Sequence, residues 1–139
     1  MAENGLVNDY KPTDDESFMN DRMRDYFRRK LHDWKEDLLR ESRETIEHLQ
    51  AADSHHPDIA DRASSETARS IELRARDRQR KLINKIDAAI RRIDDGSYGY
   101  CEETGEPISV QRLDARPIAT LSLEAQERHE RREKVYRDE

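Results

Sequence analysis

The chain has 139 residues, of which 42% are charged and 33% hydrophobic, and its formal net charge is −6. This composition leaves little apolar material for a thick globular core, so it favours one modest domain or an elongated helical protein. The negative charge argues against a nonspecific duplex-DNA binder, which would neutralise phosphates with an overall basic face.

Three absences narrow the class of protein further. A single cysteine rules out an intramolecular disulfide. No apolar run has the length of a membrane span, and the N-terminal residues lack the basic-then-apolar layout of a signal peptide. We therefore expect a cytoplasmic protein with no membrane contact.

Residues 1–21 carry six acids against one lysine and show no sustained period, which predicts an acidic, partly flexible segment. From residue 22 a helical pattern begins, and it stops around residue 52, where "DSHHPD" brings turn formers. Its apolar residues recur at steps of three, four and seven, as expected of one apolar seam: Phe27, Leu31, Trp34, Leu38, Thr45 and Leu49.

A second helix is expected from about Asp58 to the residue before Gly96, a length of roughly 55 Å. Its seam is predicted at Ala68, Ile71, Ala75, Leu82, Ile86, Ala89 and Ile93. Neither long helix can bury its seam alone, so the sequence predicts an antiparallel helical hairpin over residues 22–95, with its tip near 52–63. The fold class is therefore mainly α.

Residues 96–121 follow the hairpin and read as a small ribbon-like region. Gly96 is placed to cap the preceding helix, and Gly105 in "ETGEP" is placed in a tight turn. Ser122 is the expected N-cap of a final charged helix over residues 122–139, with Glu124 favourable in its first turn.

The run from "DIADRASSETARSIELRARDRQRKLI" through "GYCEETGEP" to "RLDARP" resembles the TraR/DksA zinc-finger family of bacterial transcription factors. "KPTDDESFMNDRM", "YFRRKLHDWKEDL" and "REKVY" extend the resemblance over nearly the whole chain. It implies a factor without enzymatic activity that binds RNA polymerase directly. Such factors insert a coiled-coil tip into the secondary channel and modulate initiation together with the alarmone ppGpp.

The resemblance assigns the tip residues Asp58, Asp61 and Ala63 a place near the polymerase active centre. A simpler interpretation of the two acids is helix capping, because an Asp at the N-cap accepts a backbone N–H bond and a second acid favours the positive helix end. Capping and polymerase contact can coexist. No nucleophile, base or cofactor motif accompanies these acids, so they are not a catalytic pair.

Residues 69–92 carry nine basic and three acidic side chains, which form either a solvated helix face or a surface for an anion. The resemblance implies ppGpp binding together with polymerase. The matching positions are Arg78, Leu82, Lys85 and Arg116, with Arg112 nearby. Gln126 stands where the family often has lysine, which makes loss of ppGpp responsiveness the alternative hypothesis.

The family places zinc ligands at positions that correspond here to Cys101, Thr104, Ser122 and Ala125. Structural zinc needs four donors, usually thiolates and imidazoles, so we expect a degenerate, zinc-free ribbon. Its shape would then depend on packing against the hairpin base by Tyr98, Tyr100, Ile108, Val110, Leu113, Ile118 and Leu121, with the Thr104 and Ser122 hydroxyls bonded to backbone.

The remaining thiol, Cys101, is expected to be a small buried residue. Its neighbours Glu102 and Glu103 are expected to disfavour a thiolate. The expected partners are RNA polymerase and ppGpp, without direct sequence-specific DNA binding. We expect a monomer in the bound state. An enzyme is disfavoured because no phosphate loop, catalytic triad or metal-ligand set is visible.

Overall fold

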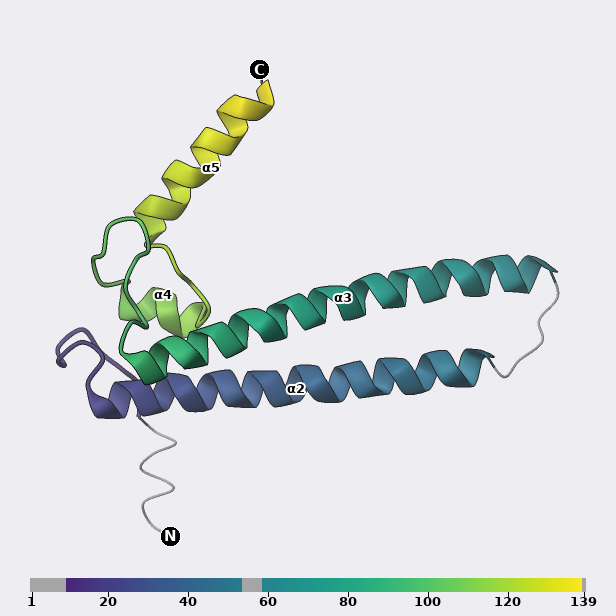
Figure 1. Ribbon diagram of the computed structural model, residues 1–139, viewed down its shortest axis with the longest axis horizontal. Helices are drawn as coiled ribbons and strands as arrows, with labels where there is room; N and C mark the ends of the chain where they lie inside the picture. The colour runs from purple at the N-terminus through teal and green to yellow at the C-terminus, as the bar shows by residue number, and fades with distance from the viewer. Residues whose placement is uncertain (1–9, 54–58, 139) are drawn as a thin grey trace, which may run out of the picture. The chain divides into compact units, whose positions relative to one another are not determined.

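The computed structural model describes residues 10–53 and 59–138, and the side chains of 52–53, 59–63 and 136–138 lie outside this description. The described residues form the helices α2 (Asp21–Asp53), α3 (Ile59–Asp95), α4 (Val110–Ala115) and α5 (Leu123–Asp138) (Figure 1). Within these residues the only strand-like pairing is an isolated antiparallel bridge between Tyr100 and Pro107. The mainly α prediction is confirmed.

The chain divides into two units, and α2 and α3 contribute to both. Unit 1 comprises residues 1–31 and 88–139, and unit 2 comprises residues 32–87. No helix in the described part of the chain combines the length and the apolar character that a membrane crossing requires.

In unit 2 the two long helices run antiparallel, and polar side chains pair across them. Lys35 lies 2.7 Å from Asp87, and further along α2 His48 lies 3.3 Å from Glu72. From the first pair to the second, the residue number rises on α2 and falls on α3, as it must in antiparallel helices. Leu38 and Ile86 are buried between these pairs. The predicted hairpin pairing is therefore present here.

The α2 seam in unit 2 follows the prediction, but the outer part of the α3 seam does not. Leu38 and Leu49 are buried as expected, whereas Ala68 and Ile71 on α3 are exposed, Ile71 by 53%. Glu72 and Gln79 face α2 instead, and their atoms Glu72 Oε2 and Gln79 Oε1 are buried without a hydrogen-bond partner.

The helical period explains why Glu72 and Gln79, and not Ile71, face α2. Glu72, Gln79 and Ile86 are spaced by seven residues and so fall on one line along the helix. Ile71 is rotated by about 100° from that line. The buried position of Ile86 fixes which line faces α2, and the polar residues on it follow.

Unit 1 contains the larger apolar core, which joins the base of α2 and α3 to residues 96–125. Its fully buried large side chains are Met23, Phe27, Leu31, Ile93, Tyr98, Ile108 and Leu113. The Phe27 and Tyr98 rings lie 5.6 Å apart, and the Tyr98 hydroxyl donates to the Pro117 carbonyl at 2.7 Å. Packing of the ribbon on the hairpin base is therefore as predicted for Tyr98, Ile108 and Leu113.

Other predicted ribbon residues are covered less completely. Val110 is buried, Ile118 and Leu121 are half-buried, and Tyr100 is 40% exposed. The Tyr100 ring packs edge-on against Phe18, with centroids 5.3 Å apart. This contact adds an N-terminal residue to the ribbon that the sequence did not suggest.

Part of the acidic N-terminal segment is held in place through Glu16. Its carboxylate accepts hydrogen bonds from the Tyr10 hydroxyl at 2.6 Å and from the Thr13 N–H at 2.9 Å. The bonds from Tyr10, Asn20 and Thr13 lower the pKa of Glu16 to about 2. Residues 1–9 lie outside the described part of the chain.

Candidate functional site

The expected tip falls mostly outside the described residues. Asp58 lies outside them, and of Asp61 and Ala63 only the helical backbone is described. The described part of the chain resumes at Ile59, where α3 begins, so the expected capping by Asp58 stays a prediction. Their contact with a polymerase stays a prediction.

Three of the four expected nucleotide-binding residues share one face of α3 in unit 2. Arg78, Leu82 and Lys85 are spaced by four and three residues, which places them on neighbouring turns. Arg78 and Lys85 are exposed, and Leu82 is half-buried. This face therefore presents two cations beside an apolar side chain.

The fourth residue, Arg116, belongs to unit 1. It follows α4 as its C-cap, is exposed, and donates its backbone N–H to the Arg112 carbonyl at 2.8 Å. The Arg112 guanidinium donates from Nε to the Leu121 carbonyl at 2.9 Å. That bond gives Arg112 a structural role, whereas the Arg116 side chain extends from an exposed residue.

Gln126, the departure from the family pattern, lies in the first turn of α5. Its side-chain amide donates to Glu130 Oε1 at 3.1 Å. The amide is neutral and already donates to a carboxylate, so it offers no positive charge to a phosphate. Gln126 therefore supplies no cation at a position where the resemblance implies that the family often has lysine.

The ribbon gathers three of the four positions of the family's zinc ligands around one sulfur. The Cys101 sulfur accepts hydrogen bonds from the Thr104 hydroxyl and from the Ser122 backbone N–H. Ala125, at the fourth position, is completely buried. The structure thus brings Cys101, Thr104 and Ser122 together, as the spacing of the expected ligand positions requires.

The hydroxyls at these positions are engaged with backbone, as the sequence predicted. Thr104 Oγ1 accepts from the Glu106 N–H at 3.2 Å, and Ser122 Oγ accepts from the Ala125 N–H at 3.2 Å. The second bond caps α5, so Ser122 is its N-cap. Gly105 completes the turn with φ at +75°, a conformation that glycine adopts without strain.

These residues do not fit a zinc ion. One thiol, two hydroxyls engaged in local bonds and a methyl group cannot provide the four thiolate or imidazole donors of a structural site. No group of three or more His, Cys, Asp or Glu side chains in the described part of the chain could hold a metal. The donor set thus contradicts the C4 pattern of the family.

Cys101 is buried as predicted, with 2% exposed surface, but its expected protonation was wrong. Burial raises the pKa of the thiol, whereas hydrogen bonds from the Thr104 hydroxyl and from the N–H groups of Ser122, Thr104 and Glu103 lower it further, to about 6. Hydrogen bonds to the sulfur favour the thiolate, and one of them comes from the backbone of the neighbouring Glu103.

One polar cluster near the ribbon was not anticipated. Asp114 in α4 accepts hydrogen bonds from the Tyr26 hydroxyl and from Lys30 Nζ, both at 2.6 Å. It thereby links the short helix to the base of α2. A carboxylate in "RLDARP" was visible in the sequence, but its partners lie more than 80 positions away.

Comparison with known proteins matches both parts of this architecture. Residues 23–93 match the DnaK suppressor protein DksA, N-terminal domain, and residues 96–131 match the prokaryotic dksA/traR C4-type zinc finger. The structure of transcription factor DksA2 from Pseudomonas aeruginosa is similar with a TM-score of 0.82 and 37% identity, covering 95% of this chain and 98% of that one.

Two curated relatives carry the same family name as the matched domains. The RNA polymerase-binding transcription factor DksA of Caulobacter vibrioides is 69% identical over 94% of this chain and 92% of its own length. The protein of the same name from Escherichia coli K12 is 41% identical over 92% of this chain and 85% of its own length. These relatives are transcription factors and not enzymes. By its two matched domains, its relatives and its helical hairpin, the chain belongs to the DksA/TraR family.

Proposed function

We propose that the protein regulates transcription by binding RNA polymerase directly. The observation that carries this proposal is the 69% identity, over 94% of the chain, to a relative named as an RNA polymerase-binding transcription factor. This similarity spans both the hairpin and the ribbon. The cytoplasm, where the polymerase works, is the corresponding location.

In the proposed mechanism the hairpin enters the polymerase secondary channel, tip first. Asp58 and Asp61 present carboxylates near the active centre, and Ala63 adds no bulk that would block close approach. The protein changes open-complex stability by contact alone, without chemistry of its own. Its net charge of −6 is consistent with a factor that acts through the polymerase and not through DNA.

The effector in this proposal is ppGpp, bound at the interface with polymerase. Arg78 and Lys85 are exposed cations on one face of α3, which suits hydrogen bonds to phosphate oxygens. The half-buried Leu82 between them offers an apolar surface. Arg116 supplies a further cation, from unit 1.

Zinc is not required in this proposal. The single buried thiol and the two backbone-bonded hydroxyls leave no set of donors for the ion. The core around Tyr98, Ile108 and Leu113 supplies the cohesion that a metal would otherwise give.

The experiment that tests the proposal is in vitro transcription from a ribosomal RNA promoter. The purified protein is treated with a chelator, checked for metal, and assayed with and without ppGpp. We expect inhibition that survives metal removal and increases with ppGpp. A protein that keeps its circular dichroism spectrum yet neither binds polymerase nor alters transcription would refute the proposed function.

The alternative is a polymerase-binding hairpin that no longer responds to ppGpp. The observation favouring it is Gln126, whose amide bonds Glu130 where a basic side chain is expected. Replacing Lys85 and Arg116 by alanine separates the two. If ppGpp-dependent inhibition falls about tenfold or more while binding to polymerase persists, the alarmone site is supported. Unchanged ppGpp dependence would favour the alternative.

A further inference from the structure

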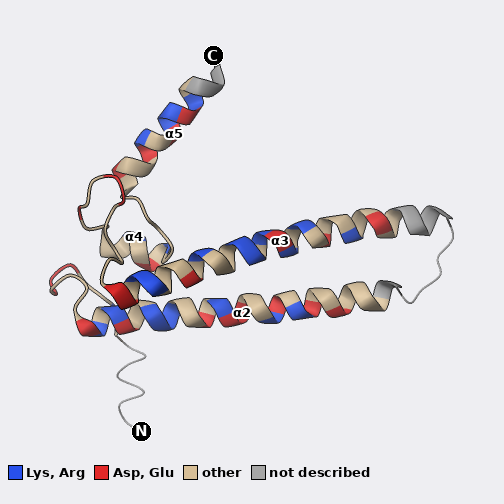
Figure 2. Cartoon of the chain, in the orientation of Figure 1, with Lys and Arg blue, Asp and Glu red and all other residues tan. Residues whose placement is uncertain are grey.

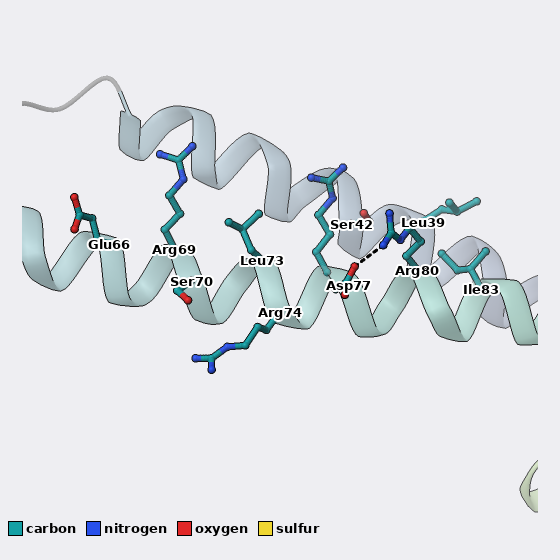
Figure 3. A pocket seen from close by; sticks show the side chains of 11 residues that line it. Leu39, Ser42, Glu66, Arg69, Ser70, Leu73, Arg74, Asp77, Arg80 and Ile83 are labelled. Atoms are coloured by element: carbon teal, nitrogen blue, oxygen red, sulfur yellow. Dashed lines mark hydrogen bonds and ion pairs between the residues drawn. The ribbon is translucent and has the colours of Figure 1, made fainter.

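The two units cover their apolar side chains in different ways. Unit 2 leaves a groove of about 800 Å³ along α3, with Leu39 and Ser42 of α2 on its other side (Figure 3). Leu73, which lines this groove, is 45% exposed. In unit 1 a segment that precedes the helices, residues 10–20, packs against the ribbon and the base of α2. Surface of unit 1 is therefore covered from within the chain, by a segment that we call the strap.

The strap contacts the ribbon next to the buried Tyr98. The Phe18 ring packs edge-on against Tyr100, with centroids 5.3 Å apart. A Cβ added at Gly99 would lie 3.0 Å from the Phe18 ring, so the strap lies directly against the Gly99 backbone. The Gly99 carbonyl in turn accepts the Ile108 N–H at 2.7 Å. Phe18 therefore covers a residue whose backbone bond helps to close the ribbon.

Two further contacts join the strap to helices of unit 1. The side-chain amide of Gln111 in α4 donates to the Asp14 carboxylate at 2.9 Å, across 97 positions of sequence. The Tyr10 ring packs edge-on against Tyr26 of α2, with centroids 5.8 Å apart, and the Arg22 guanidinium lies 4.0 Å from the centroid of the Tyr10 ring. The strap thus connects α2, α4 and the ribbon.

Hydrogen bonds also fix the shape of the strap itself. It carries three acids and one lysine, and Figure 2 shows acidic residues in the loop before α2. Such a composition is typical of a solvated tail, yet the Glu16 carboxylate accepts from Tyr10, Thr13 and Asn20. Met19 adopts a φ of +53°, a strained value for a residue other than glycine, which persists where surrounding contacts compensate for it. The closed shape of the strap is therefore specified by its own contacts.

We propose that the strap holds the zinc-free ribbon closed, in place of the metal that the family's C4 pattern would bind. A segment as short as residues 96–121 rarely keeps its shape without a metal, a disulfide or packing against another part of the chain. The core around Tyr98 supplies part of that packing, and the strap adds contacts to the two residues that follow, Gly99 and Tyr100. This role is independent of polymerase binding.

Hydrogen exchange of the full-length protein, followed by NMR for each amide, measures how firmly the ribbon is closed. The ribbon amides to follow donate to ribbon carbonyls at 2.7–2.8 Å: those of Cys101, Glu102, Gly105 and Ile108. Phe18→Ala removes the covering ring, so it should speed their exchange about tenfold or more. Leu39→Ala removes an exposed apolar side chain from unit 2 and should change them less than about twofold. Unchanged ribbon exchange in Phe18→Ala, or equal acceleration throughout unit 2, would overturn the proposal.

Tyr10→Ala distinguishes a strap that acts as a unit from local packing by Phe18. The hydrogen bond and ring contacts of Tyr10 join the strap to itself and to α2, and not to the ribbon. Tyr10→Ala should nevertheless speed exchange of the same ribbon amides about threefold or more. Tyr10→Phe keeps the ring and should restore most of the protection. If Tyr10→Ala leaves the ribbon amides unchanged, the strap does not act as a unit and the proposal fails.

A chain with four cysteines tests whether the strap takes the place of a metal. Three substitutions complete the ligand set around Cys101: Thr104→Cys, Ser122→Cys and Ala125→Cys. Zinc content is measured by mass spectrometry under native conditions. In the four-cysteine chain supplied with zinc, we expect Phe18→Ala to change exchange of the ribbon amides less than about twofold. An effect of Phe18→Ala as large as in the native chain would show that the strap and a metal are not interchangeable, and would overturn the proposal.

Discussion

Replacing Asp114 by alanine tests whether the short helix α4 is fastened to the hairpin by charge. Asp114 accepts hydrogen bonds of 2.6 Å from the Tyr26 hydroxyl and from Lys30 Nζ. Hydrogen bonds to charged groups contribute about 1.5–3 kcal/mol each, but solvent screens this pair. The side chains of Asp114 and Lys30 are 34% and 38% exposed, respectively. We therefore expect the free energy of unfolding to fall by about 1–2 kcal/mol.

The effect should depend on pH in a defined direction. Burial raises the pKa of Asp114, but the bonds from Lys30 and Tyr26 lower it more, so the folded pKa lies below the ordinary value. A carboxyl with a lowered folded pKa contributes stability that is complete above its unfolded pKa, about 3.9, and is lost as the pH falls through the folded value. The difference between wild type and Asp114→Ala should therefore be constant from pH 7 to 5 and shrink below about pH 4.

Urea denaturation followed by circular dichroism, at several pH values, measures this difference. A double-mutant cycle with Tyr26→Phe isolates the hydroxyl bond, and we expect a coupling energy of about 1 kcal/mol. A loss below about 0.3 kcal/mol at pH 7, or a loss that does not change with acid, would contradict the electrostatic explanation. The buried Leu113 and Val110, with the hydrogen bonds of Gln111 and Arg112, would then hold helix α4 in place.

The remaining predictions concern the ribbon and the tip. Tyr98→Phe removes a buried hydrogen bond to the Pro117 carbonyl, and thermal melts should show a loss of about 1–2 kcal/mol. Gly99→Ala introduces a Cβ 3.0 Å from an aromatic ring at a φ of +93°, so it should cost more than Gly105→Ala, where φ is +75° and nothing lies within 4 Å. Equal losses of stability in the two variants would show that the Phe18 ring moves aside at no cost. Asp58→Asn combined with Asp61→Asn keeps capping oxygens while removing charge. Regulation should disappear while polymerase affinity, measured by anisotropy, persists; a melted hairpin would mean that capping dominates.

The long helices could be predicted because their signals are local. Apolar spacing fixed the α2 seam at Leu38 and Leu49, and the interval without Gly or Pro fixed the extent of α3 to the residue before Gly96. Ser122 was likewise predicted as an N-cap, because a hydroxyl before an acidic first turn is a local motif.

The misplaced part of the α3 seam has a physical cause that a pattern search overlooks. Assigning every apolar residue to the interface favoured Ile71, although burial of Ile86 requires the line that contains Gln79 and Glu72. Once that line faces α2, Leu73 is displaced to the flank and helps to form the groove. Its spacing with Arg76 and Arg80 was visible in the sequence, but nothing local indicated that α2 would leave it uncovered.

The ribbon shows how ligand positions can change without loss of local structure. Hydroxyls at Thr104 and Ser122 accept backbone N–H bonds within their own turns, and the Ser122 bond also begins α5. Cys101 keeps a sulfur at the centre of the same donors. Since those N–H groups are satisfied and the core around Tyr98 is closed, we expect this region to fold without a metal. Stability of the ribbon should consequently follow core packing, so that Tyr98→Phe affects it more than a chelator does.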